Sequence, residues 1–533
     1  MTYRSLDEGA YRPEDVMPMN QTNQDQPDWR HTRYQRFYQI VDSIVPEVLA
    51  LRGDDGRIKR RLAGKRLNQL RYSVETIVRD CVAVIHQRRR KSDAAIHLGQ
   101  HAYGSSREDQ RLTYSIHVER AYRGMLRLGY IEQTRDGYHD RKGRKDGSST
   151  SRLTRYCATD KLVDLFTAEE QAVLPVIVPP KDVTLLRISQ KEDDDGVTRR
   201  VSHPIVETAE TEQMRSNLRT INRVLQRNWY DLEIDDDELE CLQVRLAADL
   251  EDPRQIDMSR RSLHRVFNDQ DLQTGGRFYG GWWQNVPREY RPYLLVNGKR
   301  MVEYDYSNQH PSILYAQAGL ERPVDCYRDV IKIKDLPDGK LPEGKTAEDL
   351  RDMVKASFNA MLNAPKPLRN PPRDVRPKSF GLKWREVSEA ILAAHAPIAQ
   401  HFYTGCGLRL QRIDSDIAER VMLAFIEMDA PILPLHDSFL VHNGYETELP
   451  MVMNAAAVEV IGVPLNATQN KKASSGKVAG DKPLRALGDI EDMQKDADWD
   501  VSQLLDTQQG WEKRLDQFFA LRTGQRSKLG SRP

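Results

Sequence analysis

Two aspartates in this chain stand where apolar, strand-like runs end in a turn. Asp305 follows MVEY and precedes an apolar, helix-like run that begins at Ser312, and Asp437 follows ILPLH. Two buried carboxylates repel each other, so bringing them together implies a cation between them. Oxygen ligands without cysteine suit Mg²⁺ or Mn²⁺, which bind through one or two carboxylates and the phosphates of a substrate. If the two turns meet, the sequence predicts a divalent metal site that acts on a phosphorylated substrate.

A pair of cations complements the two carboxylates. Arg351 and Lys355 lie one helical turn apart in RDMVKASFNAMLNA, and we expect them on one helix face where they would meet an anionic substrate. Two metal ions about 4 Å apart, beside a cationic helix, are the equipment for in-line nucleotidyl transfer. The spacing therefore predicts transfer chemistry on a nucleoside triphosphate.

Two further stretches accompany these groups. TGGRFYGGWWQNVP precedes the first aspartate, and its tryptophans, Trp282 and Trp283, are either a stacking platform for bases or core anchors. We favour core anchors, because most tryptophans are largely buried. The basic, proline-rich stretch APKPLRNPPRDVRPK, residues 364–378, is either a loop that contacts a nucleic-acid strand or a solvated turn.

Taken in order, these stretches resemble the palm and fingers of family A DNA polymerases and of the related single-subunit phage-type RNA polymerases, over residues 255–450. The DYS at Asp305 resembles motif A, whose aspartate holds both metal ions. Arg351 and Lys355 resemble motif B on the fingers helix, which grips the triphosphate. The HDS at Asp437 resembles motif C, which supplies the second metal ligand.

The resemblance implies roles for specific residues and two bound Mg²⁺ (or Mn²⁺) ions. The catalytic group would be Asp305, Asp437, Lys355 and Arg351, with the two aspartates as metal ligands. Nucleotide contacts would come from Tyr306, Ser307, His310, Asn359 and Asn363. Nucleic-acid contacts would come from Arg277, Gln284, Asn285, Gln411 and His436, with the arginine at the primer terminus.

Several positions depart from the family pattern. His310 stands where family A DNA polymerases carry a glutamate that excludes the 2′-hydroxyl; the imidazole would either block that hydroxyl or hydrogen-bond to it. Asn363 and Ala364 replace the Tyr-Gly of motif B, and HDSF, with Ser438, matches the RNA polymerase form of motif C. The chain before residue 255 is too short and too helical for an exonuclease domain, so we expect no proofreading activity.

The N-terminal part has a different pattern. A helical periodicity over residues 67–85 is followed by a short segment that we predict as helical, SDAAIHLGQHAYG, and by a second strong helix that ends near Gly129. Two strand-like runs, YIEQ and LTRYCAT, then flank a basic loop. This order resembles a winged helix-turn-helix domain, or else is a generic small α+β domain with an exposed loop. In the first case the loop directs four side chains towards phosphates, namely Arg141, Lys142, Arg144 and Lys145.

The bulk composition excludes some classes of protein. No apolar run approaches the ~20 residues needed to cross a bilayer, and the first residues lack the apolar stretch of a secretory signal. Five cysteines are scattered without a CxxC pair, which argues against a zinc site or a disulfide framework and favours a reducing, cytoplasmic environment. The net charge of +1 averages over basic and acidic blocks, so particular faces are expected to meet polyanions.

The fold class expected is α+β: a mostly helical chain with an antiparallel polymerase-type palm sheet, helical fingers and thumb, and a small winged-helix-like N-terminal domain. A last amphipathic helix over residues 501–522 is expected to dock on the palm or on a protein partner. The predicted segments are a flexible arm (1–33), the winged-helix-like domain (34–172), a linker and thumb-like region (173–254), palm and fingers (255–468), and a linker with the C-terminal helix (469–533).

Three functions are consistent with these patterns. The leading hypothesis is a DNA polymerase without proofreading that extends a DNA primer–template with nucleoside triphosphates and serves a mobile element, phage or plasmid. The first alternative is an RNA polymerase or primase with the same palm. The second is a non-catalytic, DNA-binding replication initiator or defence factor.

Overall fold

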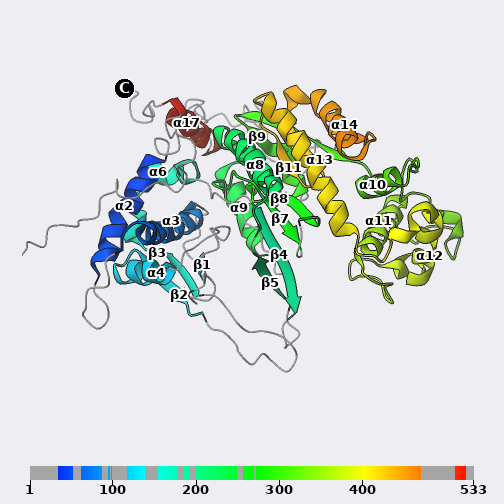
Figure 1. Cartoon of the computed structure of the whole chain (residues 1–533), viewed down its shortest axis with the longest axis horizontal. Helices are drawn as coiled ribbons and strands as arrows, with labels where there is room; N and C mark the ends of the chain where they lie inside the picture. The colour runs from blue at the N-terminus through cyan, green and yellow to red at the C-terminus, as the bar shows by residue number, and fades with distance from the viewer. Residues whose placement is uncertain are drawn as a thin grey trace, which may run out of the picture.

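The structure, a computed structural model, shows an elongated chain in which an N-terminal unit, a central sheet region and a helical lobe follow one another (Figure 1). Figure 1 places α2, α3 and α4 at one end and α11 and α12 at the other, with α13 running between the sheet and the lobe. The structure describes residues 34–51, 62–86, 94–96, 98, 117–137, 154–177, 185–192, 198–203, 205–248, 256–268, 272–469 and 510–523.

The N-terminal unit packs helices against a three-stranded antiparallel sheet with the order β1-β3-β2. Its first elements are α2 (Gln35–Ala50), α3 (Lys65–His86), β1 (Ala94–Ile96), α4 (Val118–Arg127), β2 (Ile131–Arg135) and β3 (Thr154–Ala158). The helix predicted for SDAAIHLGQHAYG is wrong at its start, because residues 94–96 pair with β3 as a strand. Strand pairing here overrides a local pattern that fitted a helix equally well.

The end of α4 has the predicted form. Gly129 has a φ of +73°, and the Tyr130 amide donates to the Met125 carbonyl at 2.9 Å, which closes the helix and starts β2. The short helices α5 (Asp160–Val163), α6 (Ala168–Ala172) and α7 (Leu174–Ile177) follow β3, and α7 packs on α3. The predicted basic loop, with Arg141, Lys142, Arg144 and Lys145, lies outside the described residues.

A second, four-stranded sheet follows, with the order β5-β4-β7-β8. The pair β4–β7 is parallel and the other two pairs are antiparallel. Part of the region predicted as a linker, near the start of residues 173–254, therefore forms a hairpin at the edge of this sheet. In chain order, this part of the chain contains β4 (Leu185–Glu192), β5 (Thr198–His203), α8 (Ala209–Arg227), β6 (Tyr230–Leu232), α9 (Asp236–Ala248), β7 (His264–Asn268) and β8 (Gly275–Tyr279). Of these strands, β6 belongs to the central sheet.

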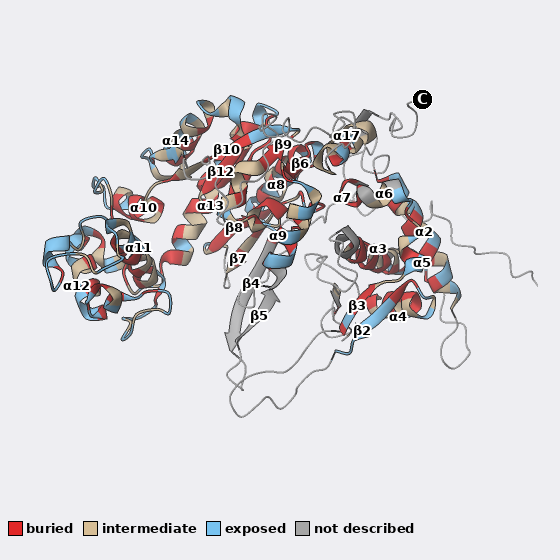
Figure 2. Cartoon of the chain, turned by 180° about the vertical axis from the view of Figure 1, so that it is seen from behind, coloured by how far each residue is buried: buried red, intermediate tan, exposed pale blue. Residues whose placement is uncertain are grey.

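The central sheet has the order β11-β12-β10-β9-β6, and all its pairs are antiparallel. Strand β13 also pairs with the end of β10. Besides β6, the strands of the central sheet are β9 (Leu294–Val296), β10 (Lys299–Tyr306), β11 (Leu433–Leu435), β12 (Ser438–His442) and β13 (Ala467–Gln469). Figure 2 shows β6, β9 and β12 of this sheet mostly in the colour of buried residues, because helices cover the sheet. Together with the helices, the sheet confirms a mixed α+β architecture.

Trp282 and Trp283 belong to this core. Both side chains are fully buried, and the Trp283 indole Nε1 donates to the Pro434 carbonyl at 3.2 Å. This excludes the stacking-platform interpretation and confirms that they are core anchors.

The helical lobe has its own apolar core, which includes Phe358, Phe402 and Trp384. Its helices and those beside it are α10 (Gln309–Gln317), α11 (Ala347–Asn363), α12 (Trp384–Ala394), α13 (Gly407–Glu427) and α14 (Glu448–Ile461). Helix α13 links the two cores, since Leu410 lies in the lobe core and Ile417 in the core of the central sheet. We call residues 313–410 the α11 lobe.

The last described helix, α17 (Gly510–Thr523), packs on the chain itself. Arg514 donates through Nε and Nη2 to the two carboxylate oxygens of Asp231, both at 2.8 Å, and both side chains are buried. This contact docks α17 on the central sheet region. None of the helices in the described part of the chain combines the length and the apolar character that a membrane span requires.

Candidate active site

The pairing of β10 with β12 places Asp305 and Asp437 at the same end of adjacent strands. Asp305 is the Cα partner of Ser438, the first residue of β12. Ser438 also pairs with Leu435 of β11, so His436 and Asp437 form a two-residue hairpin turn beside Asp305. The Tyr306 amide donates to the Asp437 carbonyl at 3.4 Å, which ties the hairpin to β10. The antiparallel register thus brings together two carboxylates that are 132 residues apart (437 − 305).

The hairpin turn depends on an unusual backbone conformation. His436 has a φ of +64°, in the left-handed region that a tight two-residue hairpin requires. Its exposed ring lies edge-on to Tyr279 of β8, with the ring centroids 5.4 Å apart. The imidazole thus supports the turn that presents Asp437.

Strand β13 holds the first aspartate from the other side. Thr468 donates through Oγ1 to Asp305 Oδ1 at 2.9 Å, and its hydroxyl lies 3.0 Å from Ser307 Oγ. The sequence interpretation missed Thr468, because it lies just before a low-complexity stretch and its strand is only three residues long. Its hydroxyl fixes one carboxylate oxygen of Asp305 and leaves Oδ2 available.

Ser438, the residue that departs from the DNA polymerase form of motif C, has a structural partner. Its hydroxyl donates to Glu303 Oε1 at 3.0 Å, and the same oxygen accepts from Arg291 Nη1 at 2.9 Å. Glu303 is buried beneath the site on β10. The serine therefore satisfies a buried carboxylate in this chain, and a carboxylate in its place would repel Glu303.

A buried ion pair lies next to the Asp437 turn. Arg277 of β8 donates through Nε and Nη2 to Asp414 Oδ2 of α13, at 2.7 and 2.6 Å. Burial raises the pKa of Asp414, and the neighbouring charge of Asp437 adds to this, while Arg277 opposes both. The side chain of Gln309 also lies against Asp414. Arg277, expected at a primer terminus, is thus held by a carboxylate that the sequence interpretation did not single out.

The close approach of β8 to α13 requires glycine. Gly276 has a φ of +79°, and a Cβ atom there would lie 2.9 Å from Ser415 Oγ of α13 and 2.8 Å from a ring carbon of Phe267. The backbone of β8 at Gly276 therefore lies against the Ser415 side chain of α13, one residue before Arg277.

His310 lies on the first turn of α10, near the same pair. Burial, with the charge of Arg277, lowers the pKa of His310 to about 4, although Asp437 acts in the opposite direction. The imidazole is therefore neutral near pH 7. Its buried Nε2 has no hydrogen-bond partner among the described residues. A neutral ring with one free nitrogen beside Asp437 is a candidate partner for a hydroxyl of a bound substrate.

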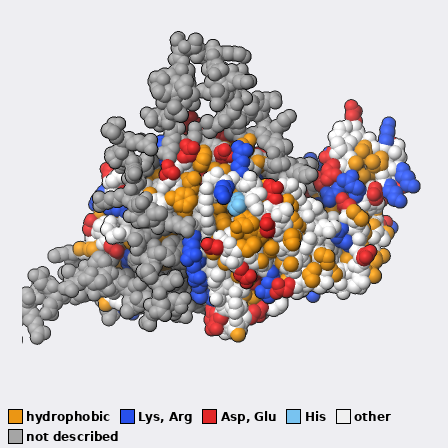
Figure 3. Space-filling view, turned by 90° about the horizontal axis from the view of Figure 1, so that it is seen from above, with side chains coloured by type: hydrophobic (Ala, Val, Ile, Leu, Met, Phe, Trp, Pro, Cys, Tyr) orange, Lys and Arg blue, Asp and Glu red, His pale blue; other side chains and the backbone are white. Residues whose placement is uncertain are grey.

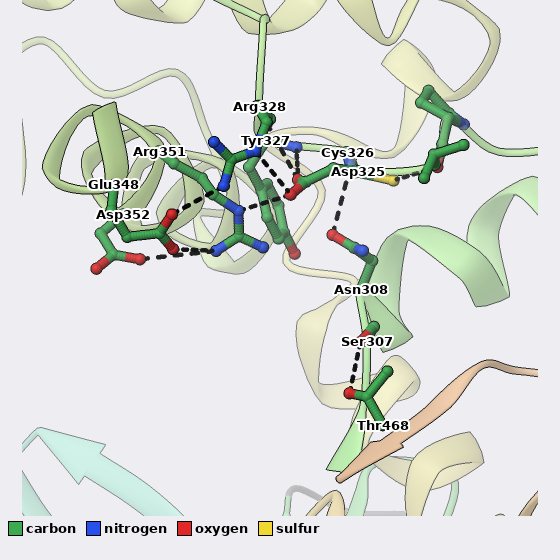
Figure 4. A network of polar contacts seen from close by, with 12 residues as sticks. Ser307, Asn308, Asp325, Cys326, Tyr327, Arg328, Glu348, Arg351, Asp352 and Thr468 are labelled. Atoms are coloured by element: carbon green, nitrogen blue, oxygen red, sulfur yellow. Dashed lines mark hydrogen bonds and ion pairs between the residues drawn. The ribbon is translucent and has the colours of Figure 1, made fainter. Parts of the chain in front are cut away.

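Arg351 is engaged within the α11 lobe (Figure 4). Its Nε donates to Asp325 Oδ2 at 2.7 Å, and Nη1 lies 3.4 Å from Glu348 and 3.7 Å from Asp352. Burial alone would raise the pKa of the Asp325 carboxyl. The hydrogen bond from Arg351, together with those that the Tyr327 and Arg328 amides donate to the other oxygen, lowers it. In this conformation the positive charge expected to grip a triphosphate is shared with protein carboxylates.

The same network reaches towards the central sheet. Asn308 Oδ1 accepts from the Cys326 amide at 3.3 Å, and Asn308 follows Ser307, which contacts Thr468 (Figure 4). A chain of polar contacts and adjacent residues therefore runs from the loop that fixes Arg351 to the threonine that holds Asp305. No sequence motif marks Asp325 or Thr468. Their roles are visible only in the structure, where Asp325 accepts from Arg351 and Thr468 donates to Asp305.

The other residues of α11 differ in availability. Lys355 is exposed, and no ion pair joins it to another described residue. Asn363 donates to the Asn359 carbonyl at 2.8 Å, and its amide packs against Gly407, where a Cβ would collide with it. Asn363 thus closes the end of the helix, and Lys355 is the freely presented cation of this face.

Two residues expected to bind nucleotide or nucleic acid, Tyr306 and Gln284, are held by protein contacts. Tyr306 is buried and donates its hydroxyl to the Met453 carbonyl at 2.6 Å. Gln284 donates to the Phe278 carbonyl at 2.9 Å and accepts from the Gly280 amide at 3.0 Å. These contacts give both side chains structural roles. Asn285 ends the 3-10 turn Trp282–Asn285, and Gln411 is half-buried on α13.

The residues present fit a divalent ion only with ligands from a substrate or from water. Within the described ranges, no three His, Cys, Asp or Glu side chains gather as a self-sufficient metal site. Asp305 and Asp437 offer oxygen donors at one sheet edge, and the nearby Asp414 is committed to Arg277. Two carboxylates completed by phosphate oxygens and water are the usual donor set of Mg²⁺.

Comparison with known proteins adds little to this geometry. No protein-family profile and no curated protein matches the sequence. Among solved structures, the chain is similar to the POL domain of Pol1 from M. smegmatis in complex with DNA primer-template and dNTP, with 15% sequence identity and a TM-score of 0.27. The match covers 48% of this chain and 52% of that chain, so the chain spans about half the length of the matched structure. A TM-score this low does not establish a common fold.

Proposed function

We propose that this chain is a template-directed nucleotidyltransferase that extends a nucleic-acid primer, with a DNA polymerase as the leading form. The observation that carries the proposal is the β10–β12 register, which sets Asp305 opposite Ser438 and so beside the Asp437 hairpin turn. Phosphoryl transfer needs little covalent help from the protein, and what it needs is charge placed around the phosphates. Two carboxylates at one end of the sheet, together with an exposed lysine on α11, would provide that arrangement.

Each residue has a defined part in this proposal. Asp305 and Asp437 would hold the divalent ions, which would neutralise charge on the phosphates and activate the attacking hydroxyl. Thr468 orients Asp305, and Lys355 is the exposed cation available to the triphosphate. Arg277 is nearly neutralised by Asp414, so it would act as a directional hydrogen-bond donor and attract phosphates only weakly.

One observation favours RNA synthesis as a second candidate. His310 occupies the position where family A DNA polymerases exclude the 2′-hydroxyl, and it is neutral with a free Nε2. Such a nitrogen can accept or donate one hydrogen bond and would suit a ribose. The N-terminal unit, with its sheet order β1-β3-β2, would bring either enzyme to a nucleic acid as a winged-helix-like domain.

The test is primer extension on a fluorescent primer–template with Mg²⁺ or Mn²⁺, comparing dNTPs with NTPs. We expect extension by the native chain and loss of extension to background in Asp437→Asn, because the substitution removes a metal-binding charge but keeps the shape of the side chain. The exposed residue Asp335 provides the matched control Asp335→Asn, which should retain activity.

The nucleotide used decides between the two candidates. Extension with dNTPs supports the DNA polymerase, and extension with NTPs alone supports the RNA polymerase or primase. Absence of incorporation under every condition, with nucleic-acid binding intact, would contradict catalysis and favour a non-catalytic DNA-binding protein.

A further inference from the structure

The loop that follows α11 carries an unpaired positive charge. In this basic loop, residues 364–378, five cationic side chains are exposed: Lys366, Arg369, Arg373, Arg376 and Lys378. The loop has one acidic residue, Asp374, so its net charge is +4 (5 − 1). No ion pair joins any of the five cations to another residue in the described part of the chain.

Three other arginines of the same lobe are neutralised by carboxylates. Arg328 pairs with Glu348 at 2.8 Å, Arg351 with Asp325 at 2.7 Å, and Arg385 with Glu389 at 2.7 Å. The charge of the basic loop is therefore a local feature and does not reflect the lobe as a whole. Like charges held close together repel each other, and a binding partner of opposite sign removes that cost.

The loop is also held in place. At its start the Gly405 amide donates to the Ala364 carbonyl at 3.0 Å, and in its middle the Trp384 indole donates to the Leu368 carbonyl at 2.9 Å. Val375 is buried in the lobe core. Five of the fifteen residues are proline, which restricts the backbone further. A fixed backbone presents its cations at a lower entropic cost on binding than a flexible one.

We propose that the basic loop binds the phosphate backbone of the single-stranded template overhang; this rests on the proposed function. The five cations are spread along the loop from residue 366 to residue 378, which suits a repeating anion better than one phosphate group. The loop directly follows α11 and belongs to a core separate from that of the Asp305–Asp437 sheet. Figure 3 shows lysine and arginine side chains on the lobe at the right, interspersed with acidic ones. A strand not yet copied would cross this lobe before it reaches the two aspartates.

The experiment compares two full-length triple variants that change the charge equally. The first is Arg369→Gln with Arg373→Gln and Arg376→Gln. The control is Arg300→Gln with Arg385→Gln and Arg420→Gln, three arginines that each pair with a glutamate elsewhere on the chain. Binding is measured by fluorescence anisotropy over a range of salt concentrations, without divalent ions or nucleotides. The probes are a primer–template with a long 5′ overhang and a blunt duplex of the same length.

We expect the loop variant to bind the overhang probe more weakly and with a salt slope reduced by about 2, since each phosphate contact on a single strand contributes about 0.7. Binding to the blunt duplex should stay at the level of the control variant. A third variant, with lysine at the three loop positions, keeps the charge and should bind the overhang probe like the native chain.

Two results would overturn the proposal. An equal loss of affinity for both probes would show that the loop contacts the duplex. A loss of affinity no larger than that of the control variant would show that the loop has no role in binding. Because the assay omits metal ions and nucleotides, its outcome is independent of catalysis. Failed primer extension with normal overhang binding would therefore contradict the proposed function and leave the strand contact of the loop standing.

Discussion

At the scale of single residues, the pair Arg277–Asp414 distinguishes this site from two turn aspartates in an ordinary core. Asp414 is almost fully buried, and Arg277 retains a side-chain exposure of 18%. The buried carboxylate has no alternative charged partner in the described residues, whereas the guanidinium can still reach towards the site. The pair is therefore better explained as support for Arg277 than as a source of stability, because buried ion pairs seldom add net stability.

Removal of one member of this pair should be more harmful than removal of both. Asp414→Asn leaves the partly buried Arg277 without its counter-charge and should destabilise α13 by about 2–4 kcal/mol, somewhat less than a fully buried pair would lose. The double variant Arg277→Met with Asp414→Leu should recover much of that loss. Native-state hydrogen exchange of the α13 amides measures both. A double variant that is no more stable than Asp414→Asn would show that the two residues are not coupled.

The residue types and their spacing were sufficient to predict that Asp305 and Asp437 lie where strands meet a turn and that Lys355 lies on a helix. Residue types and spacing did not show that Arg351 forms an ion pair with a carboxylate of the protein. Its partner Asp325 lies in a loop 26 residues earlier in the chain. The amides of Tyr327 and Arg328 hold the Asp325 carboxylate in the position where it meets Arg351. Interactions of this kind depend on tertiary geometry and have no local periodicity.

At the scale of elements, the contact between β8 and α13 determines where Arg277 points. Gly276→Ala should lower the thermal midpoint clearly more than Gly319→Ala does. Both glycines have positive φ values, +79° and +67°, so both substitutions add a backbone strain of about 1 kcal/mol. At Gly276 the new Cβ would also collide with Ser415 and Phe267, whereas at Gly319 nothing lies within 4 Å.

Circular dichroism melting of the two glycine variants beside the native chain is the measurement, and primer extension reports whether Arg277 has moved. Equal midpoints for the two variants would mean that β8 can shift away from α13 without cost, and that the close contact does not position the arginine.

Elements with a strong and uninterrupted pattern were predictable. The helix before Gly129 and the two strands after it follow from apolar spacing and a glycine stop, and all three are present. Strands β1 and β13 were not predicted, because each has only three residues and forms by pairing with a distant strand. Strand β13 matters most among them, since it carries Thr468 to Asp305.

At the scale of the whole molecule, α17 connects parts that are far apart in the sequence. It contacts α6 and α7 of the N-terminal unit, and Phe518 packs on Trp229 beside the central sheet with ring centroids 5.6 Å apart. The amphipathic pattern showed that this helix has an apolar face but gave no information on what covers it. The decisive contact, Arg514 with Asp231, joins positions 283 residues apart.

Arg514→Met should release α17 and loosen the N-terminal unit at the same time. The substitution leaves buried Asp231 without its counter-charge, a loss of about 3 kcal/mol or a factor of about 100 in local opening. Trp229 still donates to Asp231 at 2.9 Å, which keeps that carboxylate partly satisfied. The control is Lys513→Met on the same helix, which makes the same charge change at an exposed position and should have little effect. Hydrogen exchange should therefore accelerate in α17, β6, α6 and α7 of the Arg514 variant alone. Faster exchange confined to α17 would show that the helix is only docked on the surface, and that the N-terminal unit is held to the central sheet by other contacts.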